Sequence, residues 1–289
     1  MSTPIEQKSL VEVKRLVQNR VDLPVMPRVA NVVMGEVTSE KSNAARLAQL
    51  ISSDEALAGR IMRVSNSAFY RGPLPTTTLQ QAIERLGRNL LRDLVISLSS
   101  QSLFRTMGEL EERLWSHSIA AGIAARLVAE KGRGVDQDEA FIGGLLHDIG
   151  KTVLNAAFPE RFADTVKRAV KEGIPSYEAE QLAFGCHHAA VGGVLLMEWD
   201  LPQDLANAVL WHHSLSDLSK VPANSRKLAV TLAAADEVVN ALGINAPDQP
   251  LELPEPSVLK EHLRFSDKAI EDLKERVASL YEEERSLFG

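Results

Sequence analysis

Six of the seven histidines lie at only four places in the chain, and two aspartates accompany them. In chain order, the candidate residues are His117, His147, Asp148, His187, His188, His212, His213 and Asp236. Imidazole nitrogens mixed with carboxylate oxygens suit Fe, Mn, Ni or Zn, whereas Ca and Mg prefer oxygen ligands alone. A single histidine on an apolar face is more often a hydrogen-bonded core residue than a ligand. As a set, these residues predict a site for one or two metal ions, and a hydrogen-bonded polar cluster is the alternative.

The central stretch, residues 143–151, places His147 beside Asp148 at the end of an apolar run. Asp136 is a suitable cap for the helix that leads into it, and this helix is expected to end near Gly150. His147 and Asp148 would then occupy its last turn. One and two turns before His147 lie the small residues Gly143, Gly144 and Ala140, so another helix could approach this face closely.

Four other predicted helices each carry a further candidate on an apolar face: His117, His188, His212 and Asp236. Helical phase favours His188 over its neighbour His187 as the inward residue, and the choice between His212 and His213 stays open. Five helices would thus each contribute a ligand-type side chain to one interior region.

Apolar residues recur at helical spacing through most of the chain, and no run shows the strict alternation of a strand. The sequence therefore predicts an all-α fold. Its expected parts are an N-terminal helix (1–21), an N-terminal helical part (22–105), a histidine-containing helical subdomain (106–243), and a linker with four prolines followed by a C-terminal helix (244–289). The apolar stripe of the C-terminal helix predicts packing onto the body of the protein, with an oligomer contact as the alternative.

Composition narrows the class of protein. With 289 residues and 45% hydrophobic content the chain can bury a core, and its formal net charge of −7 argues against a general nucleic-acid-binding surface. No apolar run approaches the ~20 residues of a membrane helix, and the N-terminus lacks the layout of a secretion signal. Cys186 is the only cysteine, so we expect a cytoplasmic protein, with this residue buried rather than reactive.

Residues 144–151, Gly-Leu-Leu-His-Asp-Ile-Gly-Lys, resemble the central motif of the HD superfamily of metal-dependent phosphohydrolases, which includes the HD-GYP branch. Other stretches resemble the HDOD domain (HD-related output domain) of bacterial signalling proteins. They are residues 23–27, 47–51, 53–57, 63–70, 81–87, 188–192, 199–202 and 212–213. The resemblance covers about residues 20 to 240 and implies the helical HDOD fold.

The two resemblances imply different functions. The HD superfamily implies that one or two metals are held by His117, His147, Asp148, His188, His212, His213 and Asp236. Asp148 and Lys151 would serve catalysis if the protein is active. HDOD proteins are mostly noncatalytic regulators, which implies a signalling output module that binds a protein partner or a small nucleotide-like ligand. The alternative is a metal-dependent phosphohydrolase acting on a nucleotide or cyclic dinucleotide.

Two departures from the HD-GYP pattern bear on this choice. Arg113 stands where that branch can carry a glutamate ligand, which argues against a third metal. Residues 214–218, Ser-Leu-Ser-Asp-Leu, follow His213 in place of Gly-Tyr-Pro, which argues against hydrolysis of cyclic-di-GMP.

Overall fold

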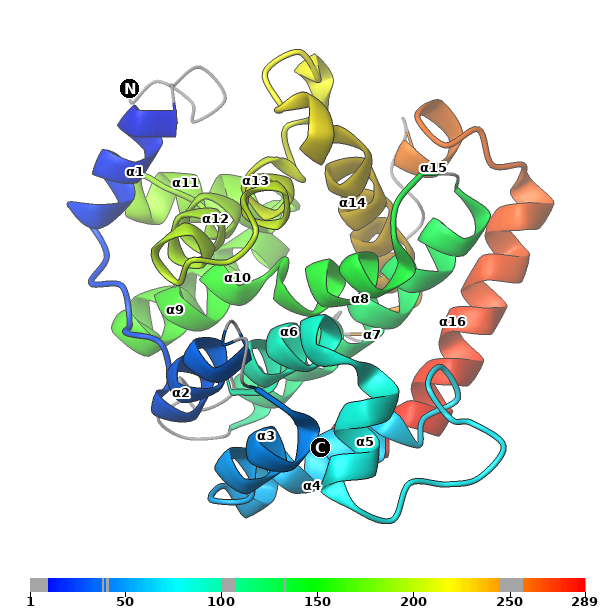
Figure 1. Ribbon diagram of the computed structural model, residues 1–289. Helices are drawn as coiled ribbons and strands as arrows, with labels where there is room; N and C mark the ends of the chain where they lie inside the picture. The colour runs from blue at the N-terminus through cyan, green and yellow to red at the C-terminus, as the bar shows by residue number, and fades with distance from the viewer. Residues whose placement is uncertain are drawn as a thin grey trace. The chain divides into compact units, whose positions relative to one another are not determined.

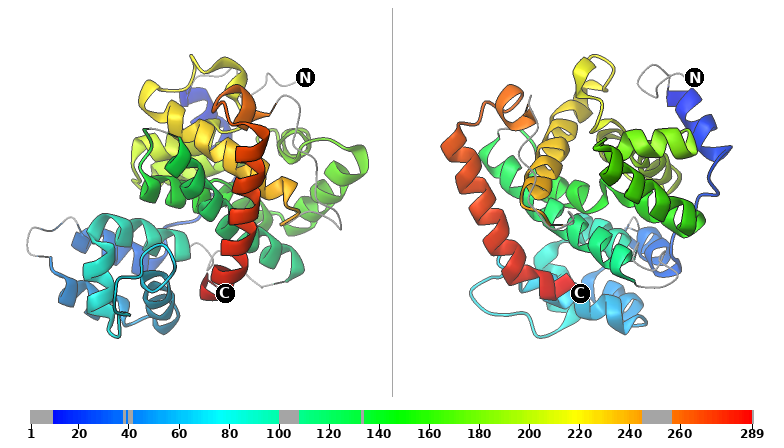
Figure 2. Two further views of the ribbon diagram at one scale, coloured as in Figure 1. Left: turned by 90° about the vertical axis from the view of Figure 1, so that its right-hand side faces the viewer. Right: turned by 180° about the vertical axis from the view of Figure 1, so that it is seen from behind.

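The computed structural model describes residues 10–37, 39, 42–99, 108–132, 134–244 and 257–288. Every regular element in these ranges is a helix (Figures 1 and 2), which confirms the predicted all-α class. None of the described helices is long and apolar enough to cross a membrane. Most of the predicted proline-containing linker, residues 245–256, lies outside the described residues.

The chain divides into two compact units. Unit 1 comprises residues 1–25 and 103–275, and unit 2 comprises residues 26–102 and 276–289. All of the candidate metal-binding residues belong to unit 1.

Unit 2 is built mainly from five helices. They are α2 (Arg28–Val37), α3 (Ala44–Ile51), α4 (Glu55–Ser65), α5 (Leu79–Leu86) and α6 (Arg88–Ser99). Asn43, Asp54 and Thr78 begin three of them, each by accepting a hydrogen bond from a backbone N–H three residues later. Their apolar faces meet in a core that includes the fully buried Ile61 and Leu91.

The loop between α4 and α5 is held by hydrogen bonds from Asn66, at its start, and from Arg85 of α5. Asn66 donates to the Thr76 carbonyl oxygen over 3.0 Å and accepts from the Thr76 N–H over 2.8 Å. Arg85 donates to the carbonyl oxygens of Ser65 and Leu74 over 3.2 and 2.6 Å. These bonds satisfy backbone groups that no helix satisfies, so this segment is a structural turn.

Unit 1 contains the remaining α-helices. They are α1 (Leu10–Gln18), α7 (Glu109–Lys131), α8 (Gln137–Leu146), α9 (Ile149–Ala157), α10 (Pro159–Glu172), α11 (Ser176–Phe184), α12 (His188–Glu198), α13 (Gln203–Trp211), α14 (Arg226–Ala241), α15 (Val258–Glu261) and the start of α16 (Asp267–Phe288). Helix α7 packs against α8 and α14, while α12 packs against α9 and α13 (Figure 1). Ile270 and Leu273 of α16 are buried, which agrees with the predicted packing of this helix.

Glycines set the spacing of the helices around the central motif. A Cβ atom on Gly144 would lie 2.3 Å from the Ala121 carbonyl oxygen of α7, and one on Gly150 would lie 2.0 Å from the His188 carbonyl oxygen of α12. Only glycine allows backbones to approach this closely. The prediction that small residues before His147 admit another helix is therefore confirmed.

The predicted end of the central helix was wrong. Helix α8 ends at Leu146, His147 and Asp148 form a turn, and α9 begins at Ile149. Asp148 leaves the helical conformation, with φ −101° and ψ 11°, and its carbonyl oxygen accepts the N–H of Lys151 in the first turn of α9. Because the helix is interrupted here, the axes of α8 and α9 can point in different directions, so that α8 packs on α7 while α9 packs on α12.

We expect Gly144→Ala to lower the free energy of unfolding by about 3 kcal/mol, because the added methyl group meets backbone atoms that cannot move independently. Gly35→Ala in α2 is the control: its Cβ would have no atom within 4 Å, so the higher helix propensity of alanine should stabilise slightly. Urea unfolding followed by circular dichroism measures both. An unchanged midpoint for Gly144→Ala would contradict the close approach of α8 to α7.

Candidate metal centre

The first candidate group brings together side chains from α7, the α8–α9 turn and α14. His117, His147, Asp148 and Asp236 each offer one ligand atom, and these atoms all lie within 4.8 Å of one another. His117 Nε2 lies 3.2 Å from His147 Nε2, 3.1 Å from Asp236 Oδ1 and 3.4 Å from Asp148 Oδ2. Ligand atoms bound at about 2.1 Å around one ion lie roughly 3.0–3.4 Å apart, so the spacing around His117 fits a single metal.

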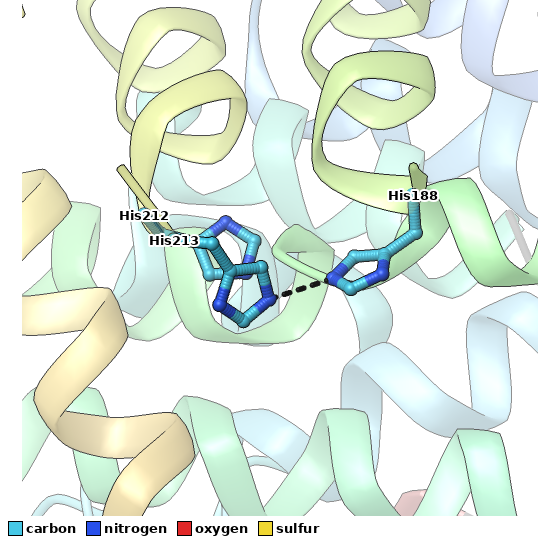
Figure 3. A group of neighbouring side chains, drawn as sticks. All are labelled: His188, His212 and His213. Atoms are coloured by element: carbon cyan, nitrogen blue, oxygen red, sulfur yellow. Dashed lines mark hydrogen bonds between the residues drawn. The ribbon is translucent and has the colours of Figure 1, made fainter. Parts of the chain in front are cut away.

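The second candidate group consists of His188, His212 and His213 (Figure 3). His188 opens α12, while His212 and His213 follow the last residue of α13, and the Nε2 atoms of His188 and His213 lie 2.9 Å apart. The structure thus brings both members of the His212–His213 pair into the group. His187 instead precedes α12 as its N-cap residue, outside both groups.

Asp148 stands between the two groups. Its Oδ2 atom faces His117 and His147, whereas its Oδ1 atom lies 3.0 Å from His188 Nε2. Lys151 places its Nζ atom 2.6 Å from Oδ2 of the same carboxylate. A carboxylate that offers one oxygen to each side can bridge two ions, so the arrangement has the form of a two-metal centre.

Hydrogen bonds outside the groups orient several of the rings. The Nδ1 atoms of His147 and His212 lie 2.8 and 2.7 Å from the carbonyl oxygen three residues earlier, and Nδ1 of His188 lies 2.6 Å from Glu180 Oε2. Those oxygens can only accept, so each Nδ1 carries a proton, and the Nε2 atom of the neutral ring is free to bind a metal. The buried Nε2 atom of His212 has no hydrogen-bond partner in the described part of the chain. An unpaired buried lone pair of this kind fits a metal ion.

Burial and neighbouring charges determine the protonation of the histidines in the second group. Burial, followed by the positive charges of His147 and His188, lowers the pKa of His212 to about 3. Burial opposes protonation of His188 as well, but the Glu180 and Asp148 carboxylates outweigh it and raise the pKa of that ring to about 9. Metal binding to His188 must therefore displace a proton.

The two aspartates stay ionised despite their burial. Burial acts to raise their pKa values, but His147 and Lys151 hold the pKa of Asp148 well below its usual range, and His117 and His147 do the same for Asp236. The pKa of Lys151 is raised because Asp148 and Glu180 outweigh the effect of burial. In the metal-free protein, Lys151 and protonated histidine rings thus balance these buried carboxylates, and a bound metal cation would take the place of the ring protons.

Helix α11 contributes residues that the sequence analysis did not single out. Glu180 is 2% exposed and bonds to His188, and the Tyr177 ring stacks on the His213 ring with centroids 4.7 Å apart. No sequence pattern points to Glu180, because the burial of its side chain depends on the packing of α11 beside α12. Cys186 is buried, and burial raises its pKa to about 11, which agrees with the prediction of an unreactive core residue.

The fold and the clustered histidines and aspartates define an HD-related helical protein. A family model described as the HDOD domain matches residues 23–215. Because the match covers more than half of the chain, this protein belongs to the HDOD domain family.

The chain is also similar to two curated proteins. It is 24% identical over 227 residues to an uncharacterized protein of Treponema pallidum, a match that covers 78% of this chain and 44% of that protein. It is 28% identical over 216 residues to ribonuclease Y of Fusobacterium nucleatum, a match that covers 72% of this chain and 34% of that protein. The chain spans less than half of the length of these relatives.

Solved structures share the helical fold. An HDOD domain protein of unknown function from Geobacter sulfurreducens aligns with a TM-score of 0.73 at 23% identity, covering 96% of this chain and 97% of that one. A protein from Shewanella amazonensis, described as a proposed metal-dependent phosphohydrolase, aligns with a TM-score of 0.64 at 22% identity, covering 96% of this chain and 99% of that one.

Proposed function

We propose that this HDOD protein is a cytoplasmic bacterial signalling module built around a buried centre of one or two divalent transition metals. The observation that carries the proposal is the convergence of four ligand atoms from His117, His147, Asp148 and Asp236 within 4.8 Å. A metal held there would join α7, the α8–α9 turn and α14. Its presence would then control how firmly these helices are held together.

The enclosure of the centre favours a signalling role over turnover. The side chains of His117, His147, Asp148 and His188 are at most 3% exposed, whereas those of Asp236 and Lys151 are 14% and 13% exposed. An ion so enclosed would hold helices together more readily than it would receive a large substrate. The output would be binding of a signalling protein or of a small nucleotide-like ligand.

Elemental analysis of protein purified without a metal-binding tag tests this proposal. We expect one to two equivalents of Fe, Mn, Ni or Zn, and we expect removal of the metal by a chelator to lower Tm by several degrees, because only the folded state holds the ligands together. Folded protein that contains no metal, and whose Tm responds to none of these four ions, would contradict it.

A metal-dependent phosphohydrolase acting on a nucleotide or cyclic dinucleotide is the second candidate. The observation that favours it is the position of Asp148 between the two groups, with Lys151 beside it. Metals bound there would supply Lewis-acid polarisation of a phosphate ester and activation of water. Lys151 stays protonated because its carboxylate neighbours raise its pKa, so it could neutralise charge on a phosphate oxygen.

Hydrolysis of bis(p-nitrophenyl) phosphate and of a panel of nucleotides by metal-loaded protein separates the two candidates. The signalling proposal expects no turnover. Turnover that falls at least about 100-fold in Lys151→Met, with the metal content retained, would instead support the phosphohydrolase.

A further inference from the structure

A buried carboxylate from α11 reaches the first residue of α12. Glu180 Oε2 lies 2.6 Å from His188 Nδ1 and 2.7 Å from the backbone N of the same residue. Glu180 and His188 are 2% and 0% exposed, so water does not compete for these bonds. One oxygen atom therefore holds both the ring and the backbone of a single residue.

The backbone bond replaces a missing cap. The first N–H groups of a helix lack partners within the helix, and a side chain at the N-cap position normally supplies one. His187 occupies the N-cap position of α12 and makes no such bond. Glu180 supplies it from a different helix, and its negative charge also suits the positive end of the helix dipole. The start of α12 and the orientation of the His188 ring thus depend on the same carboxylate.

The hydrogen-bond partner of the Nδ1 atom of His188 differs in charge from those of the other histidine rings. His147 and His212 are held by neutral carbonyl oxygens, and the buried His117 Nδ1 atom has no hydrogen-bond partner within the described ranges. A carboxylate that accepts a hydrogen bond from Nδ1 makes the Nε2 atom a stronger electron-pair donor to a metal. The same bond fixes the tautomer in which Nε2 carries no proton. This Nε2 atom lies 3.0 Å from Asp148 Oδ1 and 2.9 Å from His213 Nε2.

We propose that Glu180 is a positioning residue that presents His188 to a metal in the second group. Tyr177, one turn earlier on α11, stacks on the His213 ring, so a single helix supports two of the three histidines of this group. The first group receives no such support from the described residues of α11. The inference rests on the proposed metal centre and concerns the relative affinity of its two positions.

Glu180→Gln tests the proposal because it keeps the shape of the side chain and removes its charge. Stepwise titration of metal-free protein with Zn²⁺ against a competing chelator should show one of the two binding steps weakened about 10- to 100-fold and the other unchanged. Glu178→Gln, an exposed residue on the same helix, should leave both affinities unchanged. Glu180→Asp, which keeps the charge but shortens the reach, is a second variant and should also weaken only that one step.

Long-range ¹H–¹⁵N spectra of the metal-free protein give a readout independent of metal binding. The parent His188 ring should carry its proton on Nδ1 at a pH above its own pKa, and Glu180→Leu, whose side chain cannot accept a hydrogen bond, should shift it toward a mixture of tautomers. Two equivalents bound with parental affinities by both Glu180→Gln and Glu180→Asp would overturn this inference while leaving the metal centre intact. A parent protein that binds no metal would instead contradict the proposed function, and an unchanged tautomer in Glu180→Leu would overturn the positioning role separately.

Discussion

Asp148→Asn should remove both metal equivalents from the protein. The two carboxylate oxygens of Asp148 face different groups, so one substitution takes a charged ligand from each position. An asparagine offers one neutral oxygen and an NH₂ group that cannot bind a cation. The change also leaves Lys151 without the carboxylate that lies 2.6 Å from its Nζ atom. Breaking a buried pair in this way costs about 3–5 kcal/mol of stability.

The loss of metal and the loss of stability can be separated by a second variant. Asp148→Asn combined with Lys151→Met removes both charges, so it should recover most of the stability without recovering metal. Asp164→Asn on α10 is the matched control, because the carboxylate of Asp164 is 79% exposed and its pair with Lys167 spans 3.7 Å. Elemental analysis and urea unfolding measure the two effects. Retention of two equivalents by Asp148→Asn would contradict the bridging position of this residue.

Two single substitutions should each remove one of the two metal equivalents. His117→Ala takes a ligand from the first group only, and His212→Ala takes one from the second group only. Each variant is therefore expected to keep one equivalent after gel filtration, measured by elemental analysis.

His262→Ala is the control for this pair of variants, because the seventh histidine lies exposed after α15, away from both groups. It should keep the full metal content of the parent. Loss of all metal from both His117→Ala and His212→Ala would indicate a single ion shared by the two groups.

Helical periodicity was sufficient to predict the all-α class, and it placed His117, His188 and Asp236 on inward faces, because a side chain on the apolar face of a helix must point into the core. The pair His212–His213 shows where this reasoning fails. Adjacent residues of a helix point in directions about 100° apart, which suggested that only one would face the interior. Helix α13 ends at Trp211 and His212 keeps helical backbone angles, yet both rings join the second group, with His212 buried and His213 half-buried.

The turn at His147 and Asp148 and the role of Glu180 were not predictable for a different reason. The turn depends on contacts of α8 and α9 with two other helices, and no local pattern marks it. Glu180 reaches its partner eight residues later through the packing of α11 beside α12, and it bonds partly to backbone. Sequence spacing carries no signal for a bond between a side chain and the start of another helix.

Different residues determine the spacing of the helices and the chemistry of the centre. Gly144 and Gly150 set the distances through backbone contacts, while histidines and aspartates supply the ligands. Replacing buried polar groups by apolar ones of similar volume is often neutral for stability. The scaffold can therefore survive the loss of its ligands. A protein with this fold could lose metal binding through a few substitutions and still keep the same helical framework for recognising a partner or ligand.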